Sequence, residues 1–231
     1  MIKAIIFDMD GVLIDAKEWH YEALNRALSL FGFEISRYDH LMTYDGLPTK
    51  DKLEMLSLER GLPRQLHSFI NKMKQSYTME IAHAKCKPRF VQQYALSCLK
   101  SRGYKLAVAS NSIRDSVEMM MTKANLTVYL DAMLSTADVS LAKPHPEIYV
   151  KAIARLNLAA NECLVVEDNK NGIKAAVDSG AHVLVVKGVD DVSLENISSR
   201  IREIESESRS VGVAYRAASD RSAGSPLMQA R

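Results

Sequence analysis

Short apolar runs alternate with helix-like stretches along most of this chain. The runs cover residues 3–8, 104–110, 132–135, 164–168 and 183–187, and they are rich in Val, Ile, Leu and Ala. Amphipathic stretches predict helices over 88–102, 113–124, 146–156 and 172–179. Strands separated by helices at this spacing are typical of βαβ units. We therefore expect an α/β fold with a doubly wound parallel sheet, because right-handed crossovers place helices on both faces.

The segment from residue 16 to residue 84 has a different pattern. It contains no strand-like run, and residues 18–31, 50–59 and 64–81 alternate with helical periodicity between Gly and Pro positions. This predicts an all-helical cap domain inserted after the first strand. The core domain is then formed by residues 1–15 and 85–204. From residue 205 to 231 the apolar periodicity is lost, which predicts a disordered tail.

Composition excludes several classes of protein. The 231 residues are 47% hydrophobic and carry a formal net charge of +2, with one Trp and no basic stripe, which argues against a nucleic-acid partner. The first apolar run is too short for a signal peptide or a membrane span. Three cysteines without a CxxC pair are typical of free thiols in a reducing compartment. We expect a cytoplasmic protein that is a monomer or a weak oligomer.

Polar side chains follow the predicted strands where each strand ends. Asp8 and Asp10 follow the first run, and the later groups are Ser110 and Asn111, Lys143, and Glu167 with Asp168. The carboxyl ends of parallel strands share one edge of a sheet, so these groups should meet there. Carboxylates suit Mg²⁺, which often binds substrate phosphates. A lysine and a hydroxyl can neutralise phosphoryl oxygens, and a carboxylate can attack phosphorus. The simpler alternative for the two aspartates alone is a solvated turn with local capping.

Four motifs occur together in one order. They are Asp8-x-Asp10-Gly-Val, Ser110-Asn111, Lys143-Pro and Glu167-Asp168-x-x-x-Gly172. With them the chain resembles the haloacid dehalogenase superfamily of phosphotransferases over residues 1 to about 188. The helical insert is similar to the cap of the subgroup that contains β-phosphoglucomutase and the sugar-phosphate and phosphoglycolate phosphatases.

The resemblance implies a role for each core residue. Asp8 would be the nucleophile and a metal ligand. Asp10 would be the general acid and then the base for water, with its backbone carbonyl on the metal. Lys143 would bridge Asp8 and the phosphoryl oxygens. Ser110, Asn111 and Lys143 would bind the phosphoryl group. Mg²⁺ would be bound by Asp8, Asp10, Glu167 and Asp168.

The resemblance also points to cap residues that contact substrate: His20, Gly46, Thr49 and Lys50. His20 stands where the mutase has a histidine that positions the acid/base aspartate, and the simpler alternative is a half-exposed helix residue. Gly46 fits the substrate-specificity loop. Asp45 and Thr49 stand where the mutase has a lysine and an arginine for a second phosphate, and Lys50 is the nearest replacement. An acid and a threonine favour hydrolysis over mutase chemistry.

These patterns predict a Mg²⁺-dependent phosphatase that hydrolyses a small phosphorylated metabolite through an aspartyl phosphate. A sugar-like or polyol-like phosphomonoester is the expected substrate, by analogy with the family. Two alternatives stay open: a hexose-phosphate mutase of the β-phosphoglucomutase type, and a catalytically silent binding module on the same fold. A true dehalogenase lacks the second aspartate, which is present here as Asp10.

Overall fold

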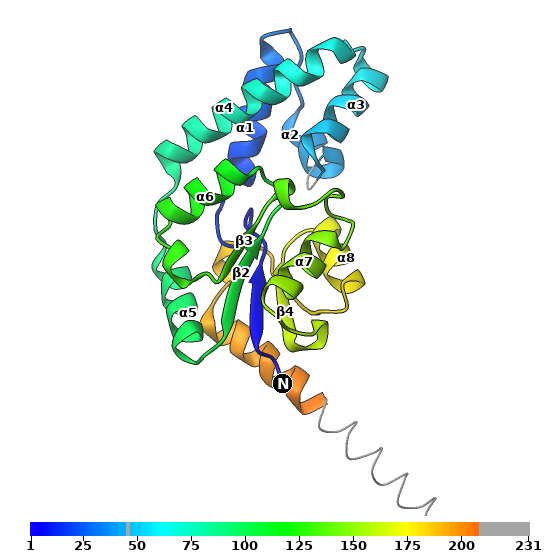
Figure 1. Cartoon of the computed structure of the whole chain (residues 1–231). Helices are drawn as coiled ribbons and strands as arrows, with labels where there is room; N and C mark the ends of the chain where they lie inside the picture. The colour runs from blue at the N-terminus through cyan, green and yellow to red at the C-terminus, as the bar shows by residue number, and fades with distance from the viewer. Residues whose placement is uncertain (45–46, 208–231) are drawn as a thin grey trace, which may run out of the picture.

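The computed structural model describes residues 1–44 and 47–207. Within these residues, five parallel strands form one sheet in the order β3-β2-β1-β4-β5 (Figure 1). Their bounds are β1 Ala4–Phe7, β2 Lys105–Ala109, β3 Ala132–Leu134, β4 Cys163–Glu167 and β5 His182–Val185. The first strand is central, and it pairs with β2 through Phe7 and Val108 and with β4 through Phe7 and Val166. The predicted doubly wound α/β fold is confirmed.

Helices cover both faces of this sheet. Apolar side chains of α5 (Phe90–Ser101), α6 (Arg114–Lys123) and the helix over residues 194–207 share one buried cluster with Ile5 and Phe7. On the opposite face, α7 (Glu147–Arg155) and α8 (Lys170–Asp178) pack on Ala4 and Ile6. Successive residues of a strand point to opposite faces, so a fully apolar β1 serves both clusters.

The described residues from α1 to α4 form a separate helical layer. It comprises α1 (Lys17–Ser29), α2 (Arg37–Asp39), a π-helical turn (His40–Tyr44), α3 (Thr49–Arg60) and α4 (His67–Lys85). Figure 1 shows this layer beyond the carboxyl ends of the strands, with α1 and α4 packed along their lengths. Its own core contains Leu28, Ile35, Leu56 and Ile70. The all-helical cap is therefore present as predicted, and the domain bounds 16–84 stay a prediction.

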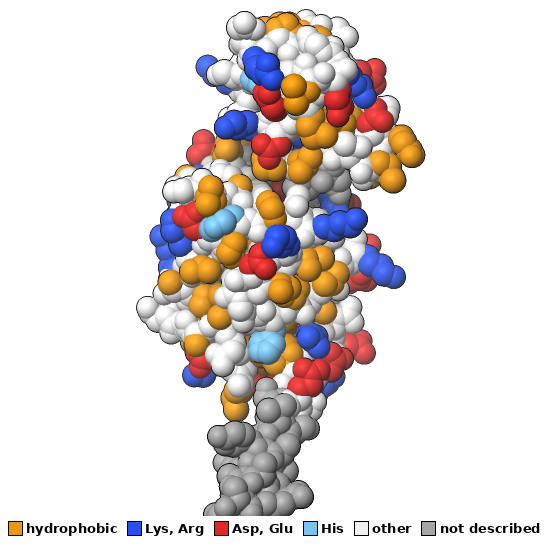
Figure 2. All heavy atoms as spheres, turned by 90° about the vertical axis from the view of Figure 1, so that its right-hand side faces the viewer, with side chains coloured by type: hydrophobic (Ala, Val, Ile, Leu, Met, Phe, Trp, Pro, Cys, Tyr) orange, Lys and Arg blue, Asp and Glu red, His pale blue; other side chains and the backbone are white. Residues whose placement is uncertain are grey.

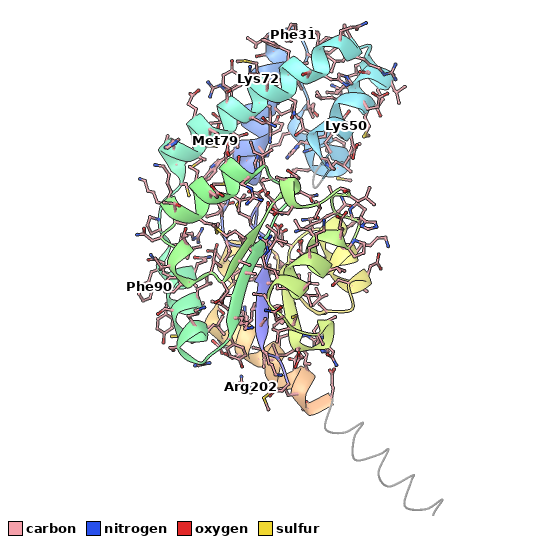
Figure 3. All side chains as sticks on the ribbon, in the orientation of Figure 1. Phe31, Lys50, Lys72, Met79, Phe90 and Arg202 are labelled. Carbon is pink, nitrogen blue, oxygen red and sulfur yellow. The ribbon has the colours of Figure 1, made fainter. Side chains whose placement is uncertain are left out.

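The cap and the sheet domain form two lobes of one elongated molecule. Figure 2 shows a narrowing between them on the face it draws, with acidic and basic side chains intermixed over both lobes. Phe31 at the far end of the cap and Arg202 in the last described helix mark the two ends of the long axis (Figure 3). A binding site at the carboxyl edge of the sheet therefore lies at the junction of the two lobes.

Most differences from the predicted elements are at their ends. The stretch 64–81 is a 3-10 turn (Arg64–Leu66) followed by α4, which continues to Lys85. The helix predicted over 172–179 begins at Lys170, because the Asn169 side chain accepts a hydrogen bond of 3.0 Å from the Gly172 backbone N–H and caps it. The predicted tail begins inside the helix over 194–207, and residues 208–231 lie outside the described residues.

Among the described residues, none of the helices has the length and apolar character required to cross a membrane.

Candidate active site

Four of the predicted site residues meet at the carboxyl edge of the sheet, three of them at the ends of neighbouring strands. Asp8 follows β1, Ser110 follows β2, and Glu167 ends β4. Strands β2 and β4 flank β1 in register, so these side chains are neighbours. Lys143 comes from the loop before α7, and its side chain is 3% exposed.

Lys143 is held by a buried network. Its Nζ lies 2.6 Å from Asp8 Oδ1 and 2.7 Å from Glu167 Oε1, and it also donates to Tyr149 Oη at 2.8 Å and to the Ala109 carbonyl at 2.8 Å. Tyr149 in turn donates to Glu167 Oε1 at 2.6 Å. Burial alone would lower the pKa of Lys143, but the two carboxylates outweigh it and raise that pKa. The ammonium is therefore a fixed positive charge beside Asp8.

The surroundings of Asp8 disfavour its charged form, unlike those of Lys143. Burial raises its pKa well above the ordinary value, and Lys143 opposes this effect while Glu167 and Asp10 add to it. Three acids and one lysine leave an excess of negative charge at this edge. Another cation beside Asp8 would favour its ionised form.

Asp10 belongs to a second network on the cap side of the cavity. Its Oδ1 lies 3.1 Å from His20 Nε2, and its Oδ2 accepts a hydrogen bond of 2.9 Å from Ser112 Oγ. Lys74 Nζ lies 3.1 Å from His20 Nδ1. Because an ammonium group can only donate, Nδ1 accepts and the proton of the imidazole lies on Nε2, the nitrogen that is close to Asp10.

The charges of this second network follow from its contacts. Burial alone would raise the pKa of Asp10, yet His20 and Ser112 outweigh it and the pKa of Asp10 is lowered. Burial lowers the pKa of His20, with Lys74 adding to the effect and Asp10 opposing it. The arrangement is therefore a neutral histidine in close contact with an ionised carboxylate.

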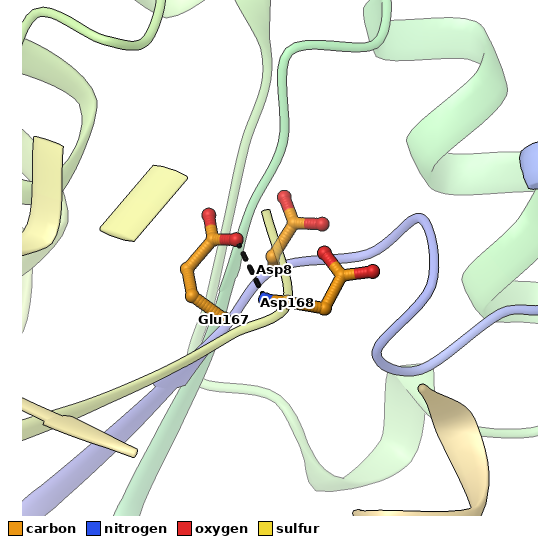
Figure 4. Close-up of side chains that lie close together, drawn as sticks. All are labelled: Asp8, Glu167 and Asp168. Carbon is orange, nitrogen blue, oxygen red and sulfur yellow. Dashed lines mark hydrogen bonds between the residues drawn. The ribbon is translucent and has the colours of Figure 1, made fainter. Parts of the chain in front are cut away.

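The acids Asp8, Glu167 and Asp168 form the cluster shown in Figure 4. One oxygen from each lies within 4.8 Å of the others. The chain comes close to these groups at two glycines: a Cβ on Gly11 would lie 2.1 Å from Asp168 Oδ2, and one on Gly172 would lie 1.8 Å from Glu167 Oε1. Clustered carboxylate oxygens without thiolate or imidazole are the donor set that suits Mg²⁺. The described residues thus fit a hard divalent cation.

All three members of this cluster already have other partners, and that of Asp8 is Lys143. Glu167 Oε1 accepts from Lys143 and Tyr149, while Glu167 Oε2 accepts from the Asp168 backbone N–H at 3.0 Å. Asp168 Oδ2 forms an ion pair of 2.6 Å with Lys17. Burial raises the pKa of Asp168, and Lys17 opposes the effect. Glu167 therefore positions Lys143 in addition to facing the cluster.

A cavity of about 140 Å³ lies between the sheet edge and the cap. The predicted residues that line it are Asp8, Asp10, His20, Thr49, Ser110, Asn111 and Lys143. Lys50 is exposed and is not part of the lining, whereas Lys52 on the same helix is. Gly46 and Asp45 lie outside the described residues. Glu167 and Asp168 are not part of the lining; they form the acidic cluster with Asp8, which lines the cavity.

The side chain of Asn111 forms hydrogen bonds with the backbone of Lys143. Its side-chain amide donates to the Lys143 carbonyl at 3.3 Å and accepts from the Lys143 backbone N–H at 3.0 Å. Asn111 therefore holds the loop that carries Lys143. Its direct contact with a phosphoryl group stays a prediction.

Other lining residues had no clear signal in the sequence. They are Lys17, His40, Lys52, Lys74 and Ser112. Lys52 lies three residues after Thr49, so helical periodicity alone places it on the same face. Lys74 is 54 residues from His20, and Tyr149 is 18 residues from Glu167. Such long-range pairs are formed by the fold and carry no local pattern.

Fold and site together define a class: a parallel α/β domain with acids, a lysine and hydroxyls at its carboxyl edge, under a helical cap. The family model for haloacid dehalogenase-like hydrolases matches residues 5–186, and the chain belongs to this family.

Similar proteins agree with this assignment. The chain is 29% identical over 179 residues to the phosphorylated carbohydrates phosphatase of Thermotoga maritima, covering 78% of this chain and 82% of that protein. It is 27% identical over 179 residues to a phosphoglycolate phosphatase of Aquifex aeolicus, again covering 78% and 82%. A β-phosphoglucomutase structure from Clostridium difficile shares the fold, with a TM-score of 0.75, 21% identity and coverage of 88% and 98%. The predicted phosphohydrolase of this superfamily is confirmed.

Proposed function

We propose that the protein is a Mg²⁺-dependent phosphatase that hydrolyses a small organic phosphomonoester through an aspartyl phosphate on Asp8. The observation that carries this proposal is the pair of networks facing one cavity. Lys143 holds Asp8 on the sheet side, and His20 with Ser112 holds Asp10 on the cap side. A nucleophile and an acid/base group are thus oriented independently.

Asp8 is the attacking group in this proposal. Lys143 holds one carboxylate oxygen and supplies a positive charge where the phosphoryl oxygens gain charge. A divalent cation held by Asp8 and Asp168, with Glu167 beside them, would neutralise further phosphoryl charge when bound. Ser110 lies at the end of β2 and lines the same cavity. Its hydroxyl is the candidate donor to the transferring group.

Asp10 transfers protons in both steps. In the free protein its pKa is lowered, so it is a carboxylate. A phosphate dianion in the cavity opposes this effect and favours the protonated form, which can donate to the leaving oxygen. The same group then accepts a proton from the water that hydrolyses the aspartyl phosphate. His20 Nε2 lies 3.1 Å from Asp10 Oδ1 and favours its ionised form in the free protein.

The direct test is phosphate release from p-nitrophenyl phosphate with and without Mg²⁺. Turnover should require Mg²⁺ and fall by at least about a thousandfold in Asp8→Asn. Ca²⁺ should inhibit, because it accepts a looser shell with more oxygens and can take both oxygens of Asp8. Activity that survives chelation, or an Asp8→Asn variant near wild-type rate, would reject the proposal.

A mutase is the second candidate, and the cap cations Lys52 and Lys74 in the cavity lining are the observation that favours it. A mutase must hold a bisphosphate, which needs positive charge away from Asp8. Phosphorus NMR of β-glucose 1-phosphate with glucose 1,6-bisphosphate separates the two activities. Free phosphate supports the hydrolase, and fast formation of glucose 6-phosphate without free phosphate supports the mutase.

A further inference from the structure

Tyr149 is a buried tyrosine that lies outside the four sequence motifs. It is in the first turn of α7, and its fully buried side chain belongs to the apolar cluster on one face of the sheet. Its hydroxyl is directed at the reaction centre, because Oη lies 2.8 Å from Lys143 Nζ and 2.6 Å from Glu167 Oε1. A phenylalanine would fill the same space in the cluster, so the hydroxyl contributes something other than packing.

The ammonium group of Lys143 has more acceptors around it than protons to donate. Four oxygens lie 2.6 to 2.8 Å from Nζ: Asp8 Oδ1, the Ala109 carbonyl, Tyr149 Oη and Glu167 Oε1. An ammonium group carries only three N–H donors, so two of these oxygens must share one proton. Tyr149 Oη and Glu167 Oε1 are the natural pair, because they lie 2.6 Å apart. The other two protons are then directed at Asp8 and at the carbonyl.

Glu167 competes with Asp8 for this ammonium. Both carboxylates are buried, and Nζ of Lys143 lies 2.6 Å from Asp8 Oδ1 and 2.7 Å from Glu167 Oε1. The Tyr149 hydroxyl acts on both members of the Lys143–Glu167 pair, since it donates to Glu167 and accepts from Lys143. It thereby fills part of the hydrogen-bonding capacity of Glu167 that the ammonium would otherwise fill. Without the hydroxyl, Glu167 would take the shared proton alone and draw Lys143 away from Asp8.

We propose that Tyr149 is a positioning residue for phosphoryl transfer: its hydroxyl limits the hold of Glu167 on Lys143 and keeps the ammonium directed at Asp8 and the transferring group. The inference rests on the proposed function. Lys143 lines the cavity and Tyr149 does not, so Tyr149 acts through Lys143. Charge grows on the phosphoryl oxygens in the transition state, so a displaced ammonium costs more there than in the substrate complex.

Tyr149→Phe isolates the hydroxyl. Lys143 Nζ lies 4.7 Å from the centre of the Tyr149 ring, and the ring packs in the apolar cluster, so phenylalanine keeps both contacts. With p-nitrophenyl phosphate and Mg²⁺, kcat should fall by about tenfold or more, which is the range of one hydrogen bond to a charged group. KM should change by less than about threefold, because the loss falls on the transition state.

Calorimetry with two oxyanions gives a readout that a loss of folding alone would not move. Orthovanadate adopts the five-coordinate geometry of phosphoryl transfer, whereas inorganic phosphate has the geometry of the product. With Mg²⁺ present, Tyr149→Phe should weaken vanadate binding by about tenfold and phosphate binding by less than about threefold. Equal weakening of both anions would show that Tyr149 only orders the site, and unchanged vanadate binding would show that the hydroxyl is not needed. Either result rejects the inference.

Tyr44→Phe is the matched control. Tyr44 is also buried, at 1% exposure, and its hydroxyl donates to a carboxylate oxygen, Glu59 Oε2, at 3.1 Å. Tyr44 belongs to the core of the cap, and neither Tyr44 nor Glu59 lines the cavity. The control should leave both anion affinities at wild-type values. A selective loss of vanadate binding in Tyr44→Phe would assign the effect to general loosening and overturn the role of Tyr149.

A double variant tests the route through Glu167. Glu167→Gln removes the competing charge, so adding Tyr149→Phe to it should weaken vanadate binding by less than about twofold. A further loss of about tenfold in that background would overturn the route, because the two residues would then act independently.

The binding data also separate this inference from the proposed function. If the wild type releases no phosphate while vanadate and phosphate binding respond to Tyr149→Phe as expected, Tyr149 positions Lys143 and the phosphatase proposal fails. If the wild type hydrolyses p-nitrophenyl phosphate and Tyr149→Phe does so at the same rate, the phosphatase stands and the positioning role fails.

Discussion

At the scale of single residues, the metal-type end of the site contains more negative than positive side chains. Asp8, Glu167 and Asp168 crowd three carboxylates together, while Lys143 is the buried cation that two of them share. Removing an acid and removing the lysine should therefore have opposite effects on the stability of the folded protein.

Asp8→Asn should leave the metal-free protein as stable as wild type or more stable. Burial raises the pKa of Asp8, so its ionised form is disfavoured in the folded state, and Glu167 still neutralises Lys143 in the variant. Thermal melting in chelator checks this. A lower melting temperature than wild type would show that the Asp8–Lys143 pair outweighs the repulsion among the acids.

Lys143→Met should destabilise the protein by about 3–5 kcal/mol, because it leaves buried carboxylates without their counter-charge. Urea unfolding measures this difference in the free energy of unfolding. The double variant with Asp8→Asn should recover part of the loss, since the two residues are in contact and their effects are not additive. Simple addition of the two effects would contradict the network described here.

Lys17→Met should tighten Mg²⁺ binding by up to about fivefold, which corresponds to the roughly 1 kcal/mol of one partly exposed ion pair. Lys17 Nζ lies 2.6 Å from an Asp168 oxygen that faces the candidate metal cluster, so lysine and metal compete for the same charge. Calorimetry of Mg²⁺ binding to the substrate-free protein gives the answer without an activity assay. Lys174→Met, which removes the Lys174–Asp178 ion pair of α8, is the control. Weaker binding in Lys17→Met would mean that Lys17 orders the site.

At the scale of elements, the loops that follow the strands are held by their own capping contacts. Glu147, at the start of α7, accepts backbone N–H groups of Ser140 and Leu141 and pairs with Lys151 at 2.6 Å. These contacts lower the pKa of Glu147 to about 2. The loop between Leu141 and Glu147 carries Lys143, so the contacts of Glu147 hold a loop of the active site.

The stabilising effect of Glu147 should be complete above its ordinary pKa of 4.5 and should be lost as the pH falls toward about 2. The sign follows because the folded state binds the proton less tightly than the unfolded state. Glu147→Gln should therefore be less stable than wild type at pH 7, and the difference should shrink as the pH falls below 4.5 and vanish only below about pH 2. Melting curves across this range decide the matter. A constant difference at all pH values would remove the carboxylate from the explanation.

Element-scale patterns were also the part of the molecule that the sequence predicted best. Buried parallel strands read as continuous apolar runs, and the runs of β1, β2 and β4 end at polar groups of the site, such as Asp8 and Glu167. Element ends were less accurate because they depend on single caps. The Asn169 cap moved the start of α8 by two residues relative to the predicted range.

At the scale of the whole molecule, the site exists because residues far apart in the chain share one cavity. Lys74 reaches His20 across 54 residues, and Lys143 reaches Asp8 across 135. The family motifs identified the second pair, whereas nothing local marked Lys74 or Tyr149. The sequence pointed to Lys50 as the cap cation, but helical geometry turns Lys50 to solvent and Lys52 to the cavity. The sequence pattern therefore did not predict which cap lysine faces the cavity.

The central claim is that Asp8 receives the phosphoryl group and that Asp10 activates water to release it. The most direct measurement is a rapid-quench experiment on Asp10→Asn with Mg²⁺ and p-nitrophenyl phosphate. The leaving group needs no proton donor, so the first step should proceed while the second is blocked. We predict a burst of about one p-nitrophenolate per protein molecule, with the phosphoryl group found by mass spectrometry on the peptide that contains Asp8. Steady turnover without a burst, or a phosphoryl group on another residue, would contradict the account.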